Sequence, residues 1–371
     1  MRNLKIVIHL NTLTHGGTER VGSNLANRFA SEGHEVCVAT LWRGEDEFAL
    51  DPGVTRVDVG LTESDEKKGK LSRMRKRVKN LRAFLKKEKP DIVIALGYHS
   101  DFRALKAAKG LGIPVLISIR TNPEIYYSGK VDQFLIKLLY PLASGCVYQT
   151  TGQREYFAPY LQDGTRVILN PVNEKFFGVT HPAEKEKAVV HHARLVDFKD
   201  QLMLCDAFAI VHERHPDYVL RIYGEYSFDG TKELLEKKIK DLSAENFIFL
   251  MGGDCRFEEV LPKGEVYAFS SDWEGMPNSL LEAMALGMPV VATDCPCGGP
   301  RTVIRDGENG LLVPIKDPQA MADALCRLIE DKELAARLGR EAAKICDITS
   351  ADVIYSQWKE YIEEIIEKRR H

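Results

Sequence analysis

The chain has 371 residues, of which 44% are apolar and 28% charged, and its formal net charge is −3. This length exceeds what a single core comfortably supports, so two domains are expected. The slightly negative charge argues against nucleic acid as a partner, and no apolar run reaches the roughly 18 residues that cross a membrane. The eight cysteines are scattered and include no CxxC pair, which indicates free thiols in a reducing cytoplasm.

The first half of the chain alternates short apolar runs with amphipathic segments. Strands are expected over 4–10, 35–41, 91–97 and 114–120. Helices are expected over 18–31, through the 70s and 80s, and after residue 97. This order predicts a parallel sheet with helices on both faces.

A second series of the same kind begins near residue 188. Its strands are expected over 188–195, 218–225, 247–253, 266–271 and 289–294, and its helices near 200–214, in the 230s and over 277–286. The stretch 166–188 is rich in proline, asparagine and charge, which is typical of a linker. The predicted fold is therefore α/β, with two Rossmann-like, doubly wound parallel-sheet domains over 1–172 and 173–349 facing across a cleft.

The last predicted helix, over 350–371, has one apolar face. Ile354, Trp358, Tyr361 and Ile365 recur at steps of three or four residues. Such a face needs a partner, so we expect this helix to pack back on the first domain.

The run EGMPNSLLE, from Glu274 to Glu282, is the most informative segment of the chain. Pro277 suits a first helical position, and Gly287 suits the residue that ends the helix. The backbone N–H groups of the helix start therefore lie near Gly275, Met276, Pro277, Asn278 and Ser279, where a phosphate would bind. The two glutamates are acceptor-only groups suited to sugar hydroxyls, so the pattern favours a nucleotide-sugar site over an ordinary capped helix with glutamates in water.

Arg194 and Lys199, in the segment ARLVDFK, follow the first strand of the second series. A diphosphate needs about two positive charges or a metal ion to offset it. No DxD pair occurs in the sequence, so we predict no metal and no cofactor. Two such cations taken by themselves are better explained as surface residues, but their position in the second series and the glutamate run downstream favour the diphosphate role.

Two features of the first half are weaker signals. Gly16 and Gly17 would let the backbone approach a ligand at the start of a helix, although a plain turn is equally compatible. His99 follows a strand end and could line the cleft.

The segment 66–89 has twelve Lys or Arg residues and two Glu residues. Leu71, Met74, Val78, Leu81 and Leu85 give it one apolar face. A helix of this kind, centred on 70–87, can lie on an anionic membrane surface or hold an acidic diphosphate lipid. A solvated helix packed through its apolar stripe is the competing explanation, and nucleic acid is disfavoured because the segment lacks a series of interleaved aromatic residues for base stacking.

Four segments together resemble the retaining family-4 glycosyltransferases of the GT-B fold, in particular the bacterial enzymes of cell-surface polysaccharides. They are HGGTERV at 15–21, ARLVDFK at 193–199, the Glu274–Glu282 run and GENGLLV at 307–313. The resemblance implies that Arg194 and Lys199 hold the donor diphosphate, that Glu282 contacts the ribose diol, and that Glu274 faces the transferred sugar. It also implies that the Gly16–Gly17 loop closes over this site and that the base packs near Gly224, Glu225 and 251–253.

Two positions depart from the family pattern. Arg120 stands where many members have a histidine, so a catalytic histidine is not carried over, and Arg120 is instead expected to bind an acceptor or donor phosphate. The segment YGEYSFDG at 223–230 replaces the usual Gly-x-Gly-Pro loop, which leaves the identity of the base open.

The resemblance implies an enzyme that moves a hexose or N-acetylhexosamine from a UDP-sugar to a glycan acceptor with retained anomeric configuration. Arg194, Lys199 and the helix start would stabilise the leaving diphosphate, and Glu274 would orient the sugar. The expected acceptor is linked to polyprenyl diphosphate and belongs to capsule, exopolysaccharide or O-antigen synthesis, which places the enzyme in the cytoplasm at the inner face of the plasma membrane. A UDP-sugar 2-epimerase and a non-catalytic nucleotide-sugar-binding protein are the alternatives.

Overall fold

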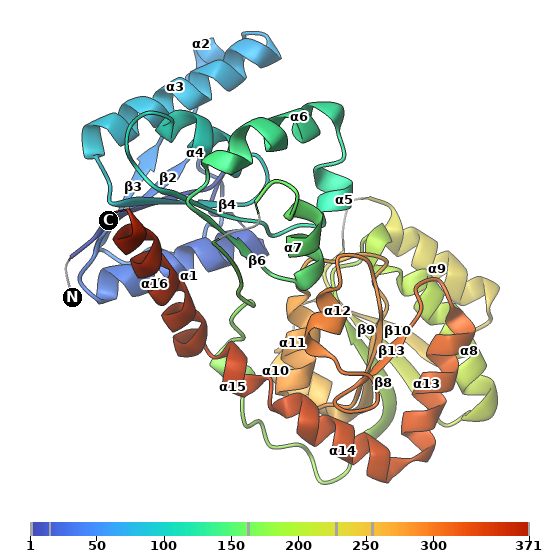
Figure 1. The fold of residues 1–371 in the computed structure, drawn as a ribbon. Coiled ribbons are helices and arrows are strands. Elements are labelled where there is room, and N and C mark those ends of the chain that lie inside the picture. The colour runs from blue at the N-terminus through green and yellow to red at the C-terminus, as the bar shows by residue number, and fades with distance from the viewer. Residues whose placement is uncertain (1–2, 15, 162–163, 227–228, 254–255, 370–371) are drawn as a thin grey trace. The chain divides into compact units, whose positions relative to one another are not determined.

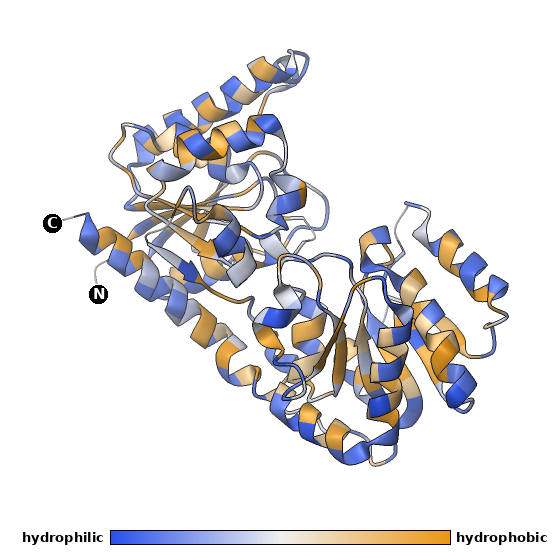
Figure 2. Ribbon diagram, turned by 45° about the vertical axis from the view of Figure 1, so that its right-hand side comes forward, coloured by the Kyte–Doolittle hydropathy of each residue, from blue (hydrophilic) through white to orange (hydrophobic). Residues whose placement is uncertain are grey.

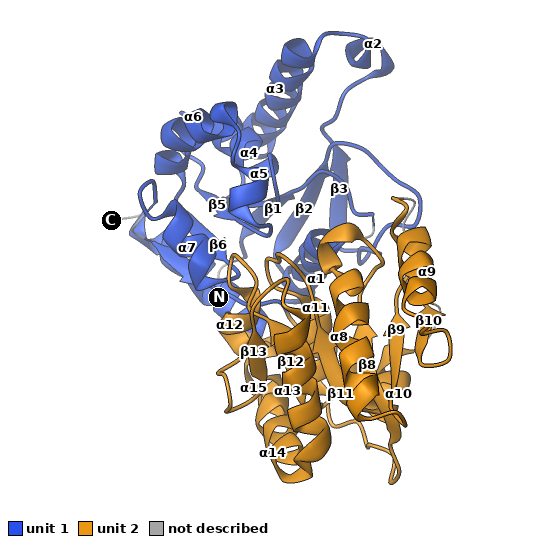
Figure 3. Ribbon diagram, turned by 90° about the vertical axis from the view of Figure 1, so that its right-hand side faces the viewer, with its two compact units in different colours: residues 1–170, 354–371 blue, residues 171–353 orange. Residues whose placement is uncertain are grey.

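The structure, a computed structural model, describes residues 3–14, 16–161, 164–226, 229–253 and 256–369. The chain forms two compact units (Figure 3): unit 1 comprises residues 1–170 and 354–371, and unit 2 comprises residues 171–353. The sequence-based boundaries, after 172 and after 349, differ from these by a few residues. His15, Cys255 and the last two residues of the predicted final helix lie outside the described residues.

Unit 1 is built on a parallel sheet with the strand order β3-β2-β1-β4-β5-β6-β7 (Figure 1). Its strands are β1 (Lys5–His9), β2 (Glu35–Thr40), β3 (Val54–Asp58), β4 (Ile92–Leu96), β5 (Val115–Ser118), β6 (Gly145–Tyr148) and β7 (Thr165–Val167). Its helices are α1 (Gly17–Ser31), α2 (Glu63–Glu66), α3 (Lys70–Glu88), α4 (Ser100–Ala108), α5 (Pro123–Tyr126), α6 (Lys130–Leu139), the 3-10 helix η1 (Tyr140–Leu142), α7 (Thr151–Phe157) and α16 (Ala351–Lys368).

Both faces of this sheet are covered by helices. Ile6 and Ile8 of β1 are buried with α1 and α16, whereas Val7 is buried with α3, α4 and α6. This alternation follows from the two-residue period of a strand. Helix α16 contributes Trp358 and Tyr361 to the first core, and the Tyr361 hydroxyl accepts the N–H of Cys146 at 3.0 Å.

Unit 2 is built on a second parallel sheet, with the order β10-β9-β8-β11-β12-β13. Its strands are β8 (Glu186–His192), β9 (Val219–Tyr223), β10 (Ile248–Gly252), β11 (Gly264–Phe269), β12 (Val290–Thr293) and β13 (Leu311–Val313). Its α-helices are α8 (Gln201–Arg214), α9 (Thr231–Asp241), α10 (Phe257–Val260), α11 (Asn278–Ala285), α12 (Gly299–Val303), α13 (Pro318–Glu330), α14 (Lys332–Ala343) and α15 (Cys346–Thr349). Its 3-10 helices are η2 (Glu174–Phe176), η3 (Asp197–Lys199) and η4 (Leu261–Lys263).

The two parallel sheets confirm the predicted fold class, and hydrophobic segments concentrate in their strands (Figure 2). The linker prediction was wrong at both ends, because 165–167 form β7 beside β6 and β8 already begins at Glu186. The described cysteines are free thiols. Within the described part of the chain, no helix combines the length and the hydropathy needed to cross a bilayer.

Candidate functional site

The segment between β11 and α11 lies at the carboxyl end of a central strand of unit 2, the edge at which open parallel sheets bind ligands. Helix α11 begins at Asn278, and Gly287, with φ of 69°, follows its end as predicted. Pro277 is the N-cap and not the first helical residue, since its ψ is 110° while its carbonyl accepts the N–H of Leu281. The N-terminus of α11 therefore lies at Asn278, one residue later than predicted.

Lys199 and Glu274 are in direct contact. Lys199 ends the 3-10 turn η3 after β8, and its Nζ forms an ion pair with Oε1 of Glu274. Both side chains are only 13% exposed. Ser271 donates to the same carboxylate oxygen at 3.2 Å. Two predicted site residues 75 positions apart are thus brought together, while Arg194 is exposed on the same β8 loop.

Glu282 is buried within α11, where it is 9% exposed. Nδ1 of His192, at the end of β8, lies 3.8 Å from its Oε2. The imidazole stacks on Phe257 at 3.6 Å, and burial lowers the pKa of His192 to about 3. His192 is therefore neutral near pH 7, and its contact with Glu282 is not an ion pair. The sequence did not single out His192, because a histidine in a buried strand has an ordinary structural explanation.

Gly224 and Glu225 lie where the ends of β8, β9 and β10 meet. The Gly224 N–H donates to the Gly252 carbonyl at 2.9 Å, and the Glu225 carbonyl accepts the N–H of Leu195 at 3.0 Å. A Cβ on Gly224 would lie 1.8 Å from the Ala193 carbonyl oxygen, so this close approach requires glycine. Residues 227 and 228 of the following loop lie outside the described residues.

Lys316 ties together the loops that carry Lys199 and Glu274. Its Nζ lies 2.9 Å from Asp200 and 2.6 Å from Asp272. Asp200 follows Lys199 directly and caps α8 by accepting from the N–H of Met203. The sequence did not suggest this role for Lys316, because it depends on contacts among three distant loops.

The neighbouring residues reinforce the same connection. The Asp272 N–H donates to the Phe198 carbonyl at 2.8 Å. The Phe198 ring stacks on Trp273 with centroids 4.2 Å apart. The loop after β8 and the loop after β11 are thus held by backbone, aromatic and charged contacts.

The substitution Lys316→Met should lower the free energy of unfolding by about 1 kcal/mol, a modest value because the lysine side chain is 60% exposed. Burial, together with the charge of Asp200, raises the pKa of Asp272 above its ordinary 3.8. The folded state then binds this proton more tightly than the unfolded state, so the contribution to stability declines as pH rises above 3.8. Lys316 opposes this shift in the pKa of Asp272, so the Lys316→Met variant should lose more stability between about pH 4.5 and 7.5 than the unaltered protein does. Urea unfolding at the two pH values measures this difference.

Lys344→Met is the matched control for this substitution. Lys344 is 66% exposed and pairs with Glu341. Equal losses in the two variants at both pH values would contradict a specific role of Lys316.

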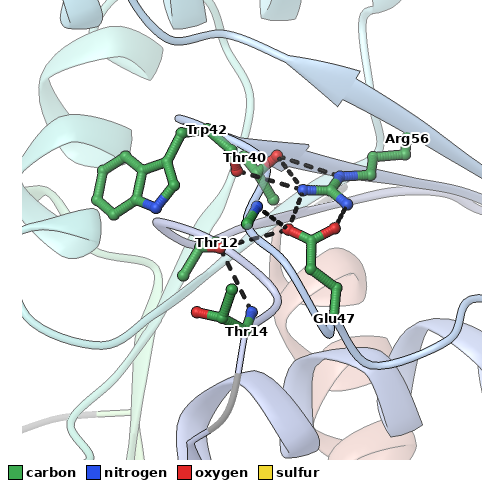
Figure 4. Close-up of polar contacts among 7 residues, drawn as sticks. Thr12, Thr14, Thr40, Trp42, Glu47 and Arg56 are labelled. Atoms are coloured by element: carbon green, nitrogen blue, oxygen red, sulfur yellow. Dashed lines mark hydrogen bonds and ion pairs between the residues drawn. The ribbon is translucent and has the colours of Figure 1, made fainter.

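The loop that leads from β1 to Gly16 and Gly17 is anchored at its start. Arg56 pairs with Glu47, and Thr12 donates to Glu47 at 3.4 Å (Figure 4). Arg56 lowers the pKa of Glu47 to about 2, so this carboxylate is ionised at any physiological pH. Gly17 begins α1, and Gly16 precedes it in an extended conformation.

Arg120 follows β5 and is held by neutral groups. It donates to Asn170 and, at 3.3 Å, to Ser118. Burial lowers its pKa to about 10, with the charge of Glu19 acting in the opposite direction. Arg120 therefore stays charged near pH 7, and Glu19 of α1 is a nearby carboxylate in the same unit.

His99 is the residue that directly precedes α4, and its φ is 64°. Its Nε2 lies 3.2 Å from Asp132 of α6, and its ring lies 3.8 Å from that of Tyr98. These residues line a groove of about 660 Å³ between α3, α4 and α6.

One group of potential metal ligands occurs among the described residues: the ligand atoms of His215, Cys326 and Glu330 lie within 4.8 Å of one another. His215 and Glu330 are already paired at 3.0 Å. Burial raises the pKa of the Cys326 thiol, which disfavours the thiolate that a metal requires. The absence of a metal remains a prediction.

Both halves of the chain match known families. Residues 15–176 match Glycosyltransferase Family 4, and residues 172–345 match Glycosyl transferases group 1. A relative from Campylobacter jejuni is 26% identical over 366 residues, which are 98% of this chain and 99% of the relative. It is named GalNAc-alpha-(1->4)-GalNAc-alpha-(1->3)-diNAcBac-PP-undecaprenol alpha-1,4-N-acetyl-D-galactosaminyltransferase.

Solved structures show the same fold. Sucrose-phosphate synthase from Thermosynechococcus elongatus has a TM-score of 0.81 at 18% identity, covering 99% of this chain and 100% of that one. Anabaena HepE in complex with UDP and glucose has a TM-score of 0.77 at 20% identity, covering 97% and 100%. Together with the family matches over both halves and the two parallel-sheet units, these findings establish that the chain belongs to the family-4 glycosyltransferases of the GT-B fold and is a glycosyltransferase.

Proposed function

We propose that this glycosyltransferase moves a hexose or N-acetylhexosamine from a UDP-sugar to a glycan acceptor, with retention of the anomeric configuration. The observation that carries the proposal is the contact between Lys199 and Glu274 beside the start of α11. A cation and a helix N-terminus are suited to a diphosphate, and a carboxylate is suited to sugar hydroxyls.

The donor diphosphate binds to Lys199, Arg194 and the N–H groups of α11. The two cations offset the diphosphate charge without a metal ion, and they stabilise the negative charge that develops as the diphosphate leaves. Lys199 exchanges Glu274 for phosphate oxygens when the donor binds. The released Glu274 carboxylate then accepts hydrogen bonds from the sugar hydroxyls and orients the sugar.

The nucleoside binds at the ends of β8, β9 and β10. Glu282 accepts hydrogen bonds from the ribose diol. His192 beside it is neutral, so it does not compete with the diol as a cationic partner of Glu282. Gly224 and Glu225 form the floor for the base. HepE, solved with UDP and glucose, supports uracil as that base.

The acceptor is a glycan linked to polyprenyl diphosphate, in the synthesis of a cell-surface polysaccharide. The Campylobacter jejuni relative, named for a diphosphate-linked undecaprenol acceptor, supports this choice. Such an acceptor places the enzyme at the inner face of the plasma membrane, where cations of α3 contact anionic lipid. In unit 1, Arg120 binds an acceptor or donor phosphate near the loop of Gly16 and Gly17.

A panel of nucleotide sugars tested by thermal shift identifies the donor, and NMR of the transferred product gives its anomeric configuration. We expect stabilisation by one UDP-sugar and an α-linked product from an α-linked donor. An inverted product would refute retention. Conversion of the donor to a different UDP-sugar without any acceptor would identify a 2-epimerase instead.

A further inference from the structure

The carboxylate of Glu282 has a neighbour, His192, to which the proposed donor contacts give no role of its own. His192 is the last residue of β8, and its Nδ1 lies 3.8 Å from Oε2 of Glu282 in α11. Both side chains are largely buried. His192 therefore lies at the carboxyl edge of the sheet of unit 2, the edge at which open parallel sheets bind ligands.

Main-chain contacts fix the position of His192. Its carbonyl accepts from the hydroxyl of Tyr267 in β11 at 3.1 Å, and His192 pairs with Tyr223 of β9 in the parallel register. The strands on both sides of β8 thus hold this residue. A backbone held in this way leaves only the side-chain torsions to determine where the imidazole points.

The face of the imidazole packs against Phe257. The two rings stack with centroids 3.6 Å apart and an interplanar angle of 28°. Phe257 is the first residue of α10, and the next residue, Glu258, pairs with Lys175 at 2.7 Å. This ion pair ties α10 to the 3-10 helix η2, so the surface against which the imidazole packs is itself anchored.

The Nδ1 of His192 is a buried polar atom without a hydrogen-bond partner among the described residues. Its distance of 3.8 Å from Glu282 exceeds that of a hydrogen bond. Buried polar atoms are nearly always hydrogen-bonded, so each exception calls for an explanation. Two other histidines of unit 2 show the ordinary arrangement, since His191 and His212 each place Nδ1 3.0 Å from a backbone carbonyl oxygen.

The neighbouring carboxylate determines which ring nitrogen of His192 carries the proton. Burial lowers the pKa of His192 to about 3, so the ring is neutral near neutral pH. A lone pair on Nδ1 would face the negative charge of Glu282, whereas an N–H bond at Nδ1 is attracted by it. The tautomer with the proton on Nδ1 is therefore favoured. His192 then presents a hydrogen-bond donor without a positive charge to Glu282.

We propose that His192 is a positioning residue for Glu282, an inference that rests on the proposed function. When the ribose binds, the carboxylate closes the short gap and accepts the Nδ1–H of His192. This hydrogen bond fixes the orientation in which the other lone pairs of the carboxylate accept from the two ribose hydroxyls. Because Nδ1 is buried, the ribose contacts Glu282 and not the imidazole.

Calorimetric titration with UDP and with 2′,3′-dideoxy-UDP tests this role without turnover. His192→Phe keeps a flat ring beside Phe257 and removes the N–H group. We expect this variant to bind UDP about tenfold more weakly, the usual contribution of one hydrogen bond, and 2′,3′-dideoxy-UDP within about twofold of the unaltered protein. General damage to the site would weaken both nucleotides alike. Equal weakening of both, or unchanged UDP binding, would overturn the proposal.

Two amide substitutions distinguish the two ring nitrogens of His192. The amide nitrogen of an asparagine lies near the place of Nδ1, and that of a glutamine lies near the place of Nε2. His192→Asn should therefore bind UDP within about threefold of the unaltered protein, whereas His192→Gln should lose about tenfold. This comparison decides the question even if His192→Phe does not fold. Equal UDP binding by the two amide variants would contradict the proposal.

His212→Phe is the matched control. His212 also stacks on a phenylalanine, Phe247, with centroids 3.7 Å apart. It lies in the last turn of α8, at the amino edge of the sheet, since α8 connects the end of β8 to the start of β9. We expect this variant to bind both nucleotides within about twofold of the unaltered protein, because distant sites act independently. A loss of UDP binding equal to that of His192→Phe would refute a specific role of His192.

Combination with Glu282→Ala shows whether the effect of His192 passes through this carboxylate. In the Glu282→Ala background, His192→Phe should change UDP binding by less than about twofold, because the group that it positions is gone. A further loss of about tenfold in this background would mean that His192 acts independently of Glu282, against the proposal.

The outcomes separate this inference from the proposed function. If the unaltered protein bound GDP instead of UDP, the uridine donor would be wrong, and the same comparison with GDP and 2′,3′-dideoxy-GDP would still test His192. If UDP binding were weakened in Glu282→Ala but not in His192→Phe, the ribose contact would stand and the role of His192 would be refuted.

Discussion

Replacement of Lys199 by alanine should lower kcat by about 10³-fold, the cost of losing one group that stabilises charge in the transition state. Lys199 is 13% exposed and pairs with Glu274 beside the start of α11, so its charge is little screened by water. As the bond to the sugar breaks, negative charge grows on the diphosphate, and the lysine interacts more strongly with it than with the intact donor. The loss should therefore fall mainly on kcat and less on the donor KM.

The Lys199→Ala variant also leaves Glu274 without its partner, so stability must be measured separately. Lys199→Arg keeps the charge and should recover part of the rate. Lys332→Ala is the control, since Lys332 also pairs with a carboxylate of unit 2, Glu265. If Lys199→Ala turned over donor at a near-normal rate, the diphosphate role would be wrong.

Glu282→Ala should raise the donor KM about 30-fold and change kcat less. Glu282 is buried in α11, and hydrogen bonds from a ribose diol to a carboxylate contribute about 1.5–3 kcal/mol. These bonds exist in the ground state and in the transition state alike, so their loss weakens binding uniformly. Steady-state kinetics over a range of donor concentrations measures the effect.

A donor analogue lacking both ribose hydroxyls gives the sharper test of Glu282. The unaltered enzyme should discriminate against this analogue, whereas Glu282→Ala should bind it and the normal donor almost equally. Glu282→Gln, which keeps an acceptor oxygen and the side-chain volume, should lie between the two. An unchanged donor KM in Glu282→Ala would rule out the ribose contact.

The fold was predictable where hydrophobic patterning is strong. The buried residues of β1 belong to two hydrophobic cores, one on each face of the sheet. The alternation of strand and helix segments correctly predicted that both sheets are parallel. Strand β3 was not predicted, because Arg56 and its neighbours are partly exposed at a sheet edge. Strand β7 was not predicted either, since three residues beside a proline-rich stretch resemble a linker.

The candidate site was predictable where one short segment contains its residues. The run from Glu274 to Glu282 and the loop of Arg194 and Lys199 are local patterns, and the structure adds the direct contact between Lys199 and Glu274. His192 and Lys316 were missed, because their relevance comes from contacts between segments far apart in sequence.

The groove of unit 1 illustrates the same limit. The charge and apolar stripe of α3 are visible in the sequence, but the groove also needs α4 and the unpredicted helix α6. Arg103 attracts no notice in the sequence, and its hydrogen bonds to His9, Asn11 and Ser100 are visible only in the structure.

The most direct test of the central claim is a transfer assay with a labelled UDP-sugar and a polyprenyl-diphosphate-linked glycan, in the presence of a metal chelator. The account predicts that the label moves into the lipid-extractable product without added metal, and that this transfer fails in Lys199→Ala. Label that stays in the nucleotide fraction as an altered UDP-sugar, or transfer that the chelator abolishes and a divalent cation restores, would contradict it.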